Sequence, residues 1–218
     1  MELAKTLFVI YFGSLLVLSA CASFIYKNTS VQHRPILYYI WALSGIAVLD
    51  MFVETGEWSG KTSYIIRCFA DVAIIMLLAF RLEIFRFRSP KFWVISGILV
   101  ALWIVEHLVI GKKELGVSWF DAASYLAIVM IAVEIMTRTV IKSRGGLLKN
   151  PVFVFSVGLI FFYSLSPILD LTILITNSPG SGTNPKGFYA PIILGIITNI
   201  IYFRSILCIP SKTNYSFN

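Results

Sequence analysis

Two ionisable side chains stand one helical turn apart within an apolar stretch, where charged groups are costly. Arg67 and Asp71 both lie in the segment Ser63–Ile84, and their spacing of four residues puts them on one face of a helix. Charges at membrane depth are kept mainly where they meet a partner, a cavity or a substrate path. The pair therefore predicts either a self-neutralising ion pair or the lining of a ligand pocket, and we hypothesise the pocket.

Further polar residues extend this hypothesis to other apolar segments. Glu54 follows the second segment, Glu106 lies toward the end of the fourth, and Asp170 lies toward the end of the sixth. Asn199 is in the middle of the seventh, where its amide needs a hydrogen-bond partner on another helix. Together with the pair above, these four residues are the predicted ligand-binding set. Each acid alone is equally typical of an interfacial position, so the hypothesis depends on their number.

No catalytic or metal-binding motif accompanies this set. The sequence has no glycine-rich phosphate loop, no Ser-His-Asp or Cys-His arrangement and no ligand cluster with metal-site spacing. His107 follows Glu106 directly, but neighbours on a helix point about 100° apart and cannot easily share one ion. We therefore predict no catalytic residue, no metal and no cofactor.

These residues must be positioned by membrane-spanning helices. The chain of 218 residues is 58% hydrophobic and 13% charged, whereas a soluble domain has roughly 25% charged residues. Apolar runs recur along the chain, and about 20 such residues cross a hydrocarbon core of about 30 Å. The runs are continuous rather than alternating, which favours helices over a barrel. The seven predicted spans are Leu7–Tyr26, Pro35–Val53, Ser63–Ile84, Phe92–Ile110, Val117–Ile141, Pro151–Ile175 and Phe188–Leu207.

Basic residues divide unevenly between the two sides of this arrangement. Twelve fall on one side, namely Lys27, Arg34, Arg81, Arg86, Arg88, Lys91, Arg138, Lys142, Arg144, Lys149, Arg204 and Lys212. Five fall on the other, namely Lys5, Lys61, Lys112, Lys113 and Lys186. An excess of Lys and Arg marks the cytoplasmic side, so we predict an outside N-terminus, a cytoplasmic C-terminus and a multi-pass protein of a bacterial inner membrane. Because the net charge of +7 sits in short loops, we predict no nucleic-acid partner.

An internal repeat is predicted within this single all-α domain, which covers residues 1–218. The pattern W-x-x-S-G-I-x-V at Trp41 recurs at Trp93, 52 residues later, and Glu54 and Glu106 keep the same spacing. Residues 35–84 and 92–141 are therefore interpreted as duplicated helical hairpins, with a weak third copy over 151–207. Chance similarity between apolar segments is the alternative. A repeat of two spans keeps its orientation in the membrane.

Three functions are compatible with these patterns. A transporter or channel-like protein for a cationic or amine solute comes first, because intramembrane charges and repeats suit that use. A heptahelical sensor that signals through a separate partner is second, and an intramembrane enzyme is third. The expected partners are the lipid bilayer, a small cationic ligand, and a cytoplasmic or membrane protein at the basic faces Arg81–Lys91 and Arg138–Lys149.

Overall fold

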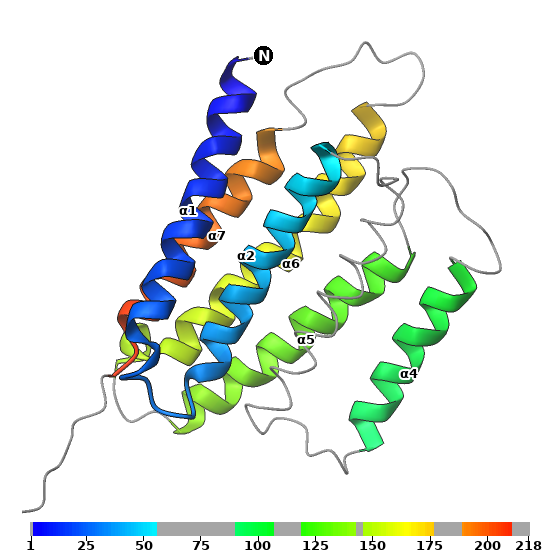
Figure 1. The fold of residues 1–218 in the computed structure, drawn as a ribbon. Coiled ribbons are helices and arrows are strands. Elements are labelled where there is room, and N and C mark those ends of the chain that lie inside the picture. Colours follow the sequence, from blue (N-terminus) through cyan, green and yellow to red (C-terminus); the bar gives the residue numbers. More distant parts are fainter. Residues whose placement is uncertain (1, 56–89, 107–118, 143–145, 177–188, 211–218) are drawn as a thin grey trace, which may run out of the picture.

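A computed structural model describes residues 2–55, 90–106, 119–142, 146–176 and 189–210. Among these residues the chain forms six α-helices and one short 3-10 turn, and no β-strand. The elements are α1 (Glu2–Tyr26), α2 (Arg34–Thr55), α4 (Pro90–Ile104), α5 (Trp119–Lys142), η2 (Leu147–Lys149), α6 (Pro151–Thr176) and α7 (Tyr189–Leu207) (Figure 1). The predicted all-α class is confirmed.

Four helices of the described chain are long and apolar enough to cross a membrane. Their spans are Thr6–Tyr26, Trp119–Ile141, Pro151–Leu169 and Tyr189–Leu207. The apolar part of α2, Arg34–Val48, is shorter. These helices indicate a membrane protein. The count of seven spans stays a prediction, because Ser63–Ile84 lies outside the described residues. The orientation also stays a prediction, because apolar helices alone do not show which end faces the cytoplasm.

Helix directions follow from contacts between named side chains. Ser44 on α2 bonds to Leu15 on α1, and Trp41 bonds to Ser19, so α1 and α2 are antiparallel. α7 lies beside α1 and parallel to it, while α6 runs antiparallel to α7 (Figure 1). α5 packs against α6, and α4 stands at the edge of the bundle beside α5. The start of α1 and the end of α7 therefore lie at opposite ends of the bundle (Figure 1).

The start of α6 shows how local sequence fixes a helix end. Asn150 Oδ1 accepts the backbone N–H groups of Val152 at 3.0 Å and Phe153 at 3.3 Å. Pro151 occupies the first helical position, where its missing N–H costs nothing. An Asn cap of this kind stabilises a helix by roughly 1 kcal/mol.

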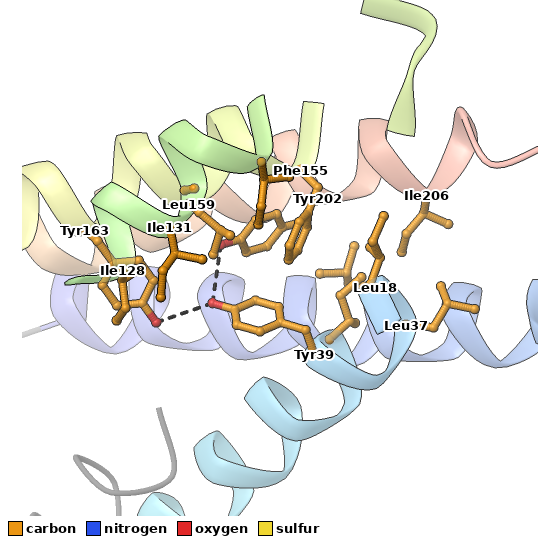
Figure 2. Packing of buried hydrophobic residues seen from close by; sticks show 14 of the residues in the cluster. Leu18, Leu37, Tyr39, Ile128, Ile131, Phe155, Leu159, Tyr163, Tyr202 and Ile206 are labelled. Atoms are coloured by element: carbon orange, nitrogen blue, oxygen red, sulfur yellow. Dashed lines mark hydrogen bonds between the residues drawn. The ribbon is translucent and has the colours of Figure 1, made fainter. Parts of the chain in front are cut away.

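The core lies between α1, α2, α5, α6 and α7. Tyr39 of α2 points between α6 and α7, with its ring 5.2 Å from Phe155 and 5.6 Å from Tyr202 (Figure 2). Tyr163 and Leu159 of α6 are also almost fully buried. Edge-on and tilted aromatic pairs at these separations add to the dispersion energy of a close-packed core.

Two glycines allow neighbouring helices to approach closely. A Cβ at Gly158 on α6 would stand 2.7 Å from Cε1 of Tyr202 on α7. A Cβ at Gly195 on α7 would stand 2.5 Å from Cε2 of Tyr11 on α1. Small residues at such crossings are how helices associate in lipid, where no hydrophobic force drives them together.

Candidate functional site

The helix directions sort charged positions to the two ends of the bundle. Toward the end where α1 begins lie the acidic positions Glu54, Glu106, Asp121 and Asp170. Toward the opposite end lie the basic positions Lys27, Arg34, Arg138, Lys149 and Arg204. We refer to these as the acidic end and the basic end. Which of them faces the cytoplasm remains a prediction.

Glu106 is the predicted site residue whose surroundings are best defined. It lies in a π-helical turn that continues α4, and it is only 4% exposed. Its Oε2 accepts the backbone N–H of Phe120 at 2.8 Å, and its Oε1 accepts that of Trp119 at 3.2 Å. Both N–H groups belong to the first turn of α5, which has no intrahelical acceptor for them. Glu106 therefore caps α5, and its role in ligand binding stays a prediction.

Asn199 lies at a different interface, between α7 and α1. It is 4% exposed, and its Nδ2 donates to Ser14 Oγ at 2.8 Å. The Ser14 hydroxyl in turn donates to the carbonyl of Tyr11 at 2.7 Å. The expectation that Asn199 pairs with another helix is confirmed. This bond holds α1 against α7 at the same crossing that Gly195 makes close.

The structure does not bring the whole predicted set together. Glu106 is at the α4–α5 contact, whereas Asn199 is at the α1–α7 contact. Arg67 and Asp71 lie outside the described residues. Glu54 and Asp170 are positioned by the backbone of α2 and α6, both near the acidic end. The predicted repeat also extends outside the described residues and stays a prediction. Within the described part, α2 and α4, the first helices of the two predicted hairpins, run in the same direction (Figure 1).

Sequence reasoning missed a buried group of three tyrosine hydroxyls. The Tyr39 hydroxyl is 3.4 Å from that of Tyr163 and 3.4 Å from that of Tyr202 (Figure 2). These are long for O–H···O bonds, whose usual length is about 2.7–2.8 Å. The rings come from α2, α6 and α7, and in a chain this apolar no spacing in the sequence marks them. They form a packed polar centre toward the basic end of the core.

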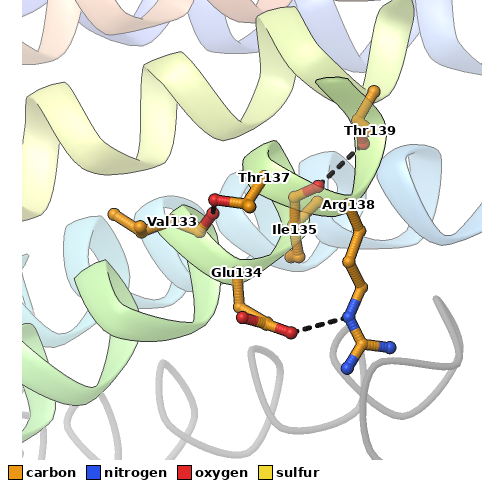
Figure 3. A network of polar contacts seen from close by, with 6 residues as sticks. All are labelled: Val133, Glu134, Ile135, Thr137, Arg138 and Thr139. Atoms are coloured by element: carbon orange, nitrogen blue, oxygen red, sulfur yellow. Dashed lines mark hydrogen bonds and ion pairs between the residues drawn. The ribbon is translucent and has the colours of Figure 1, made fainter. Parts of the chain in front are cut away.

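One predicted partner face lies partly within the described chain. On α5, Arg138 Nε donates to Glu134 Oε1 at 2.7 Å, with both side chains nearly half exposed (Figure 3). An exposed pair of this kind contributes little to stability, typically below about 1 kcal/mol. Lys149 is also exposed, just before α6. The other predicted face, Arg81–Lys91, lies almost entirely outside the described residues.

Metal chemistry has no visible site in the described ranges. Within them, no group of three or more His, Cys, Asp or Glu side chains is arranged to hold a metal ion. Comparison with known proteins returned no match: no family model, no curated protein and no solved structure matches the chain. The class of the protein therefore rests on its apolar helices, which are those of a helical membrane protein.

Proposed function

We propose that the protein binds a small cationic or amine solute at the acidic end of the bundle and carries it across the membrane. The observation that supports this most is the separation of charge along the helices. α2, α4, α5 and α6 direct most acidic positions to one end, while most basic positions gather at the other. The exceptions are Lys5 at the acidic end and Glu134 at the basic end. Clefts lined by one sign of charge raise the local concentration of oppositely charged solutes.

Within this proposal Arg67 and Asp71 form the centre of the binding site. The helix carrying them would start at the acidic end, and Asp71 would supply the carboxylate that meets the cation. Glu54 and Asp170 add negative charge nearby. Glu106 contributes by holding α4 against α5, as its two backbone hydrogen bonds indicate.

A sensor is the second candidate, and one observation favours it. The core toward the basic end is packed, with Phe155, Leu37 and Ile40 fully buried in the same cluster as the three tyrosines. A sensor needs a ligand site at one end and a docking face at the other, with no solute path between them. In that case the basic end would contact a separate signalling partner.

The test is flux into proteoliposomes. The purified protein is reconstituted, and uptake of radiolabelled methylammonium, choline and putrescine is measured against empty vesicles. The proposal expects saturable uptake of at least one of these cations. Asp71→Asn should reduce that uptake strongly at equal folded yield, because it keeps the side-chain shape and removes the charge. Glu134→Gln, which removes a carboxylate at the basic end, is the matched control and should leave uptake unchanged.

A double variant separates the pocket from a structural ion pair. Removing only one partner of a buried pair leaves an uncompensated charge, which costs roughly 3–5 kcal/mol. Arg67→Leu with Asp71→Val should fold but remain inactive if Asp71 contacts the solute. Full uptake by the folded double variant would exclude the pocket. Cation-dependent thermal stabilisation without uptake would favour the sensor.

A further inference from the structure

Three aromatic rings of α1 and α2 lie together at the basic end. The ring centroids of Tyr26 and Trp41 are 5.2 Å apart, and those of Tyr38 and Trp41 are 5.9 Å apart. The Tyr26 and Tyr38 hydroxyls are 3.0 Å apart, and Trp41 Nε1 donates to Ser23 Oγ at 3.1 Å. These contacts fix the orientation of all three rings. We call the rings of Tyr26, Tyr38 and Trp41 the aromatic platform.

The guanidinium of Arg34 lies on this platform. Its Cζ is 4.8 Å from the centroid of the Tyr26 ring, a distance at which a cation is attracted to the aromatic face. Its Nε is buried and has no hydrogen-bond partner in the described chain. No ion pair with Arg34 occurs among the described residues either. Arg34 is therefore oriented by the ring but lacks an anionic acceptor for its planar set of five N–H donors.

Arg34 lies just beyond the end of an apolar span, the part of a membrane helix that meets lipid headgroups. The apolar span of α1 ends at Tyr26, and α2 begins at Arg34 after a short turn. Lys27 in that turn is exposed, so a second positive charge is available beside the platform. Below it on α1, Phe24 is 84% exposed, as a side chain facing acyl chains would be. A cationic edge thus borders an apolar surface.

We propose that Arg34 and the aromatic platform bind the phosphodiester group of one anionic phospholipid. The planar guanidinium matches a phosphate bidentately through its two terminal nitrogens, and stacking on Tyr26 fixes the plane in which these donors lie. Lys27 adds attraction to a headgroup that carries net negative charge. The acyl chains pack along the exposed apolar side of α1. This site is independent of the solute site at the acidic end.

Native mass spectrometry of the purified full chain in detergent tests the proposal. Phosphatidylglycerol or phosphatidylcholine is titrated, and bound lipid is counted at each concentration. The wild type should bind one phosphatidylglycerol with an affinity roughly tenfold above that for phosphatidylcholine. Arg34→Gln should abolish this preference, and Arg34→Lys should restore only part of it, because an ammonium supplies charge without the planar fork. Arg204→Gln is the matched control, since it removes an exposed arginine from the same end.

Three results would overturn the proposal. The first is an Arg34→Gln variant that keeps the preference for phosphatidylglycerol. The second is an Arg204→Gln variant that loses this preference to the same extent as Arg34→Gln. The third is displacement of the lipid by inorganic phosphate at the same concentration, which would indicate a site for free phosphate. If Arg34→Gln does not fold, Tyr26→Leu replaces it, because that change removes the stack and keeps the charge. An unchanged preference in Tyr26→Leu would equally refute the site.

Discussion

The carboxylate of Glu106 accepts the backbone N–H of Phe120 at 2.8 Å and thereby joins the end of α4 to the first turn of α5. The N–H of Trp119 bonds to the other carboxylate oxygen at 3.2 Å. The N-terminus of a helix carries partial positive charge, so an anionic acceptor is favoured there. Glu106 does for α5 what a capping residue does elsewhere, from a position 14 residues earlier in the chain.

The first prediction concerns this cap. Glu106→Ala leaves two first-turn N–H groups without an acceptor, which should lower the free energy of unfolding by about 2–6 kcal/mol at roughly 1–3 kcal/mol for each orphaned group. Glu106→Gln keeps one acceptor oxygen and should lose less. Unfolding in detergent micelles, followed by circular dichroism, measures both. Normal stability with lost amine binding in Glu106→Ala would instead assign Glu106 to the ligand.

The second prediction concerns the α1–α7 crossing. Gly195→Ala places a Cβ 2.5 Å from Tyr11 Cε2, and such overpacking should cost about 1–3 kcal/mol. Gly45→Ala is the control, because a Cβ there meets nothing within 4 Å. That variant should be as stable as the wild type or more stable by up to about 1 kcal/mol, since Ala favours helix over Gly. Equal thermal midpoints for the two variants would contradict the close crossing.

The third prediction is a pH dependence from His33, in the turn between α1 and α2. Burial lowers the pKa of His33 below its ordinary value of 6.5, and its Nδ1 is 2.8 Å from Ser30 Oγ. The unfolded chain then binds the proton more strongly than the folded chain, so stability falls as the pH drops from the ordinary pKa toward the lowered one. Above both pKa values the group contributes no pH dependence.

Replacing this imidazole isolates its contribution. The thermal midpoint of the wild type should fall more than that of His33→Asn between about pH 7.5 and about pH 5.5, the range that spans an ordinary histidine pKa. Asparagine retains a polar group that can bond to Ser30. Differential scanning fluorimetry in one detergent at both pH values makes the comparison. An equal change in thermal midpoint for the two proteins between these pH values would show that the pKa of His33 is the same in the folded and unfolded chains.

The fourth prediction fixes the orientation of the bundle. α6 and α7 end at opposite ends, at Thr176 and Leu207. If the basic end is cytoplasmic, a reporter that is active only outside should work when inserted between Thr176 and Lys186. The same reporter should be inactive when fused after Lys212. The reverse pattern would put the acidic end in the cytoplasm and move the proposed solute site with it.

The sequence by itself determined the class of the protein and most helix positions. An apolar run without alternation must form a helix in lipid, because only a helix satisfies its backbone within one segment. The predicted span Pro151–Ile175 accordingly matches α6, and Phe188–Leu207 matches α7 within one residue. α4 begins before its predicted start at Phe92 and gives way after Ile104 to a π-helical turn, which local hydropathy does not encode.

Only the tertiary structure decided which residues meet. The partners of Glu106, Asn199 and Tyr39 lie 13 to 185 residues away in the chain. Helices that are apolar on every side show no periodic face, because lipid and protein interior favour the same side chains. The sequence could therefore predict that Asn199 needs a partner but could not identify Ser14. The close crossing at Gly195 brings α1 beside α7 and so determines that Asn199 meets Ser14. Such a crossing depends on the shapes of both helices.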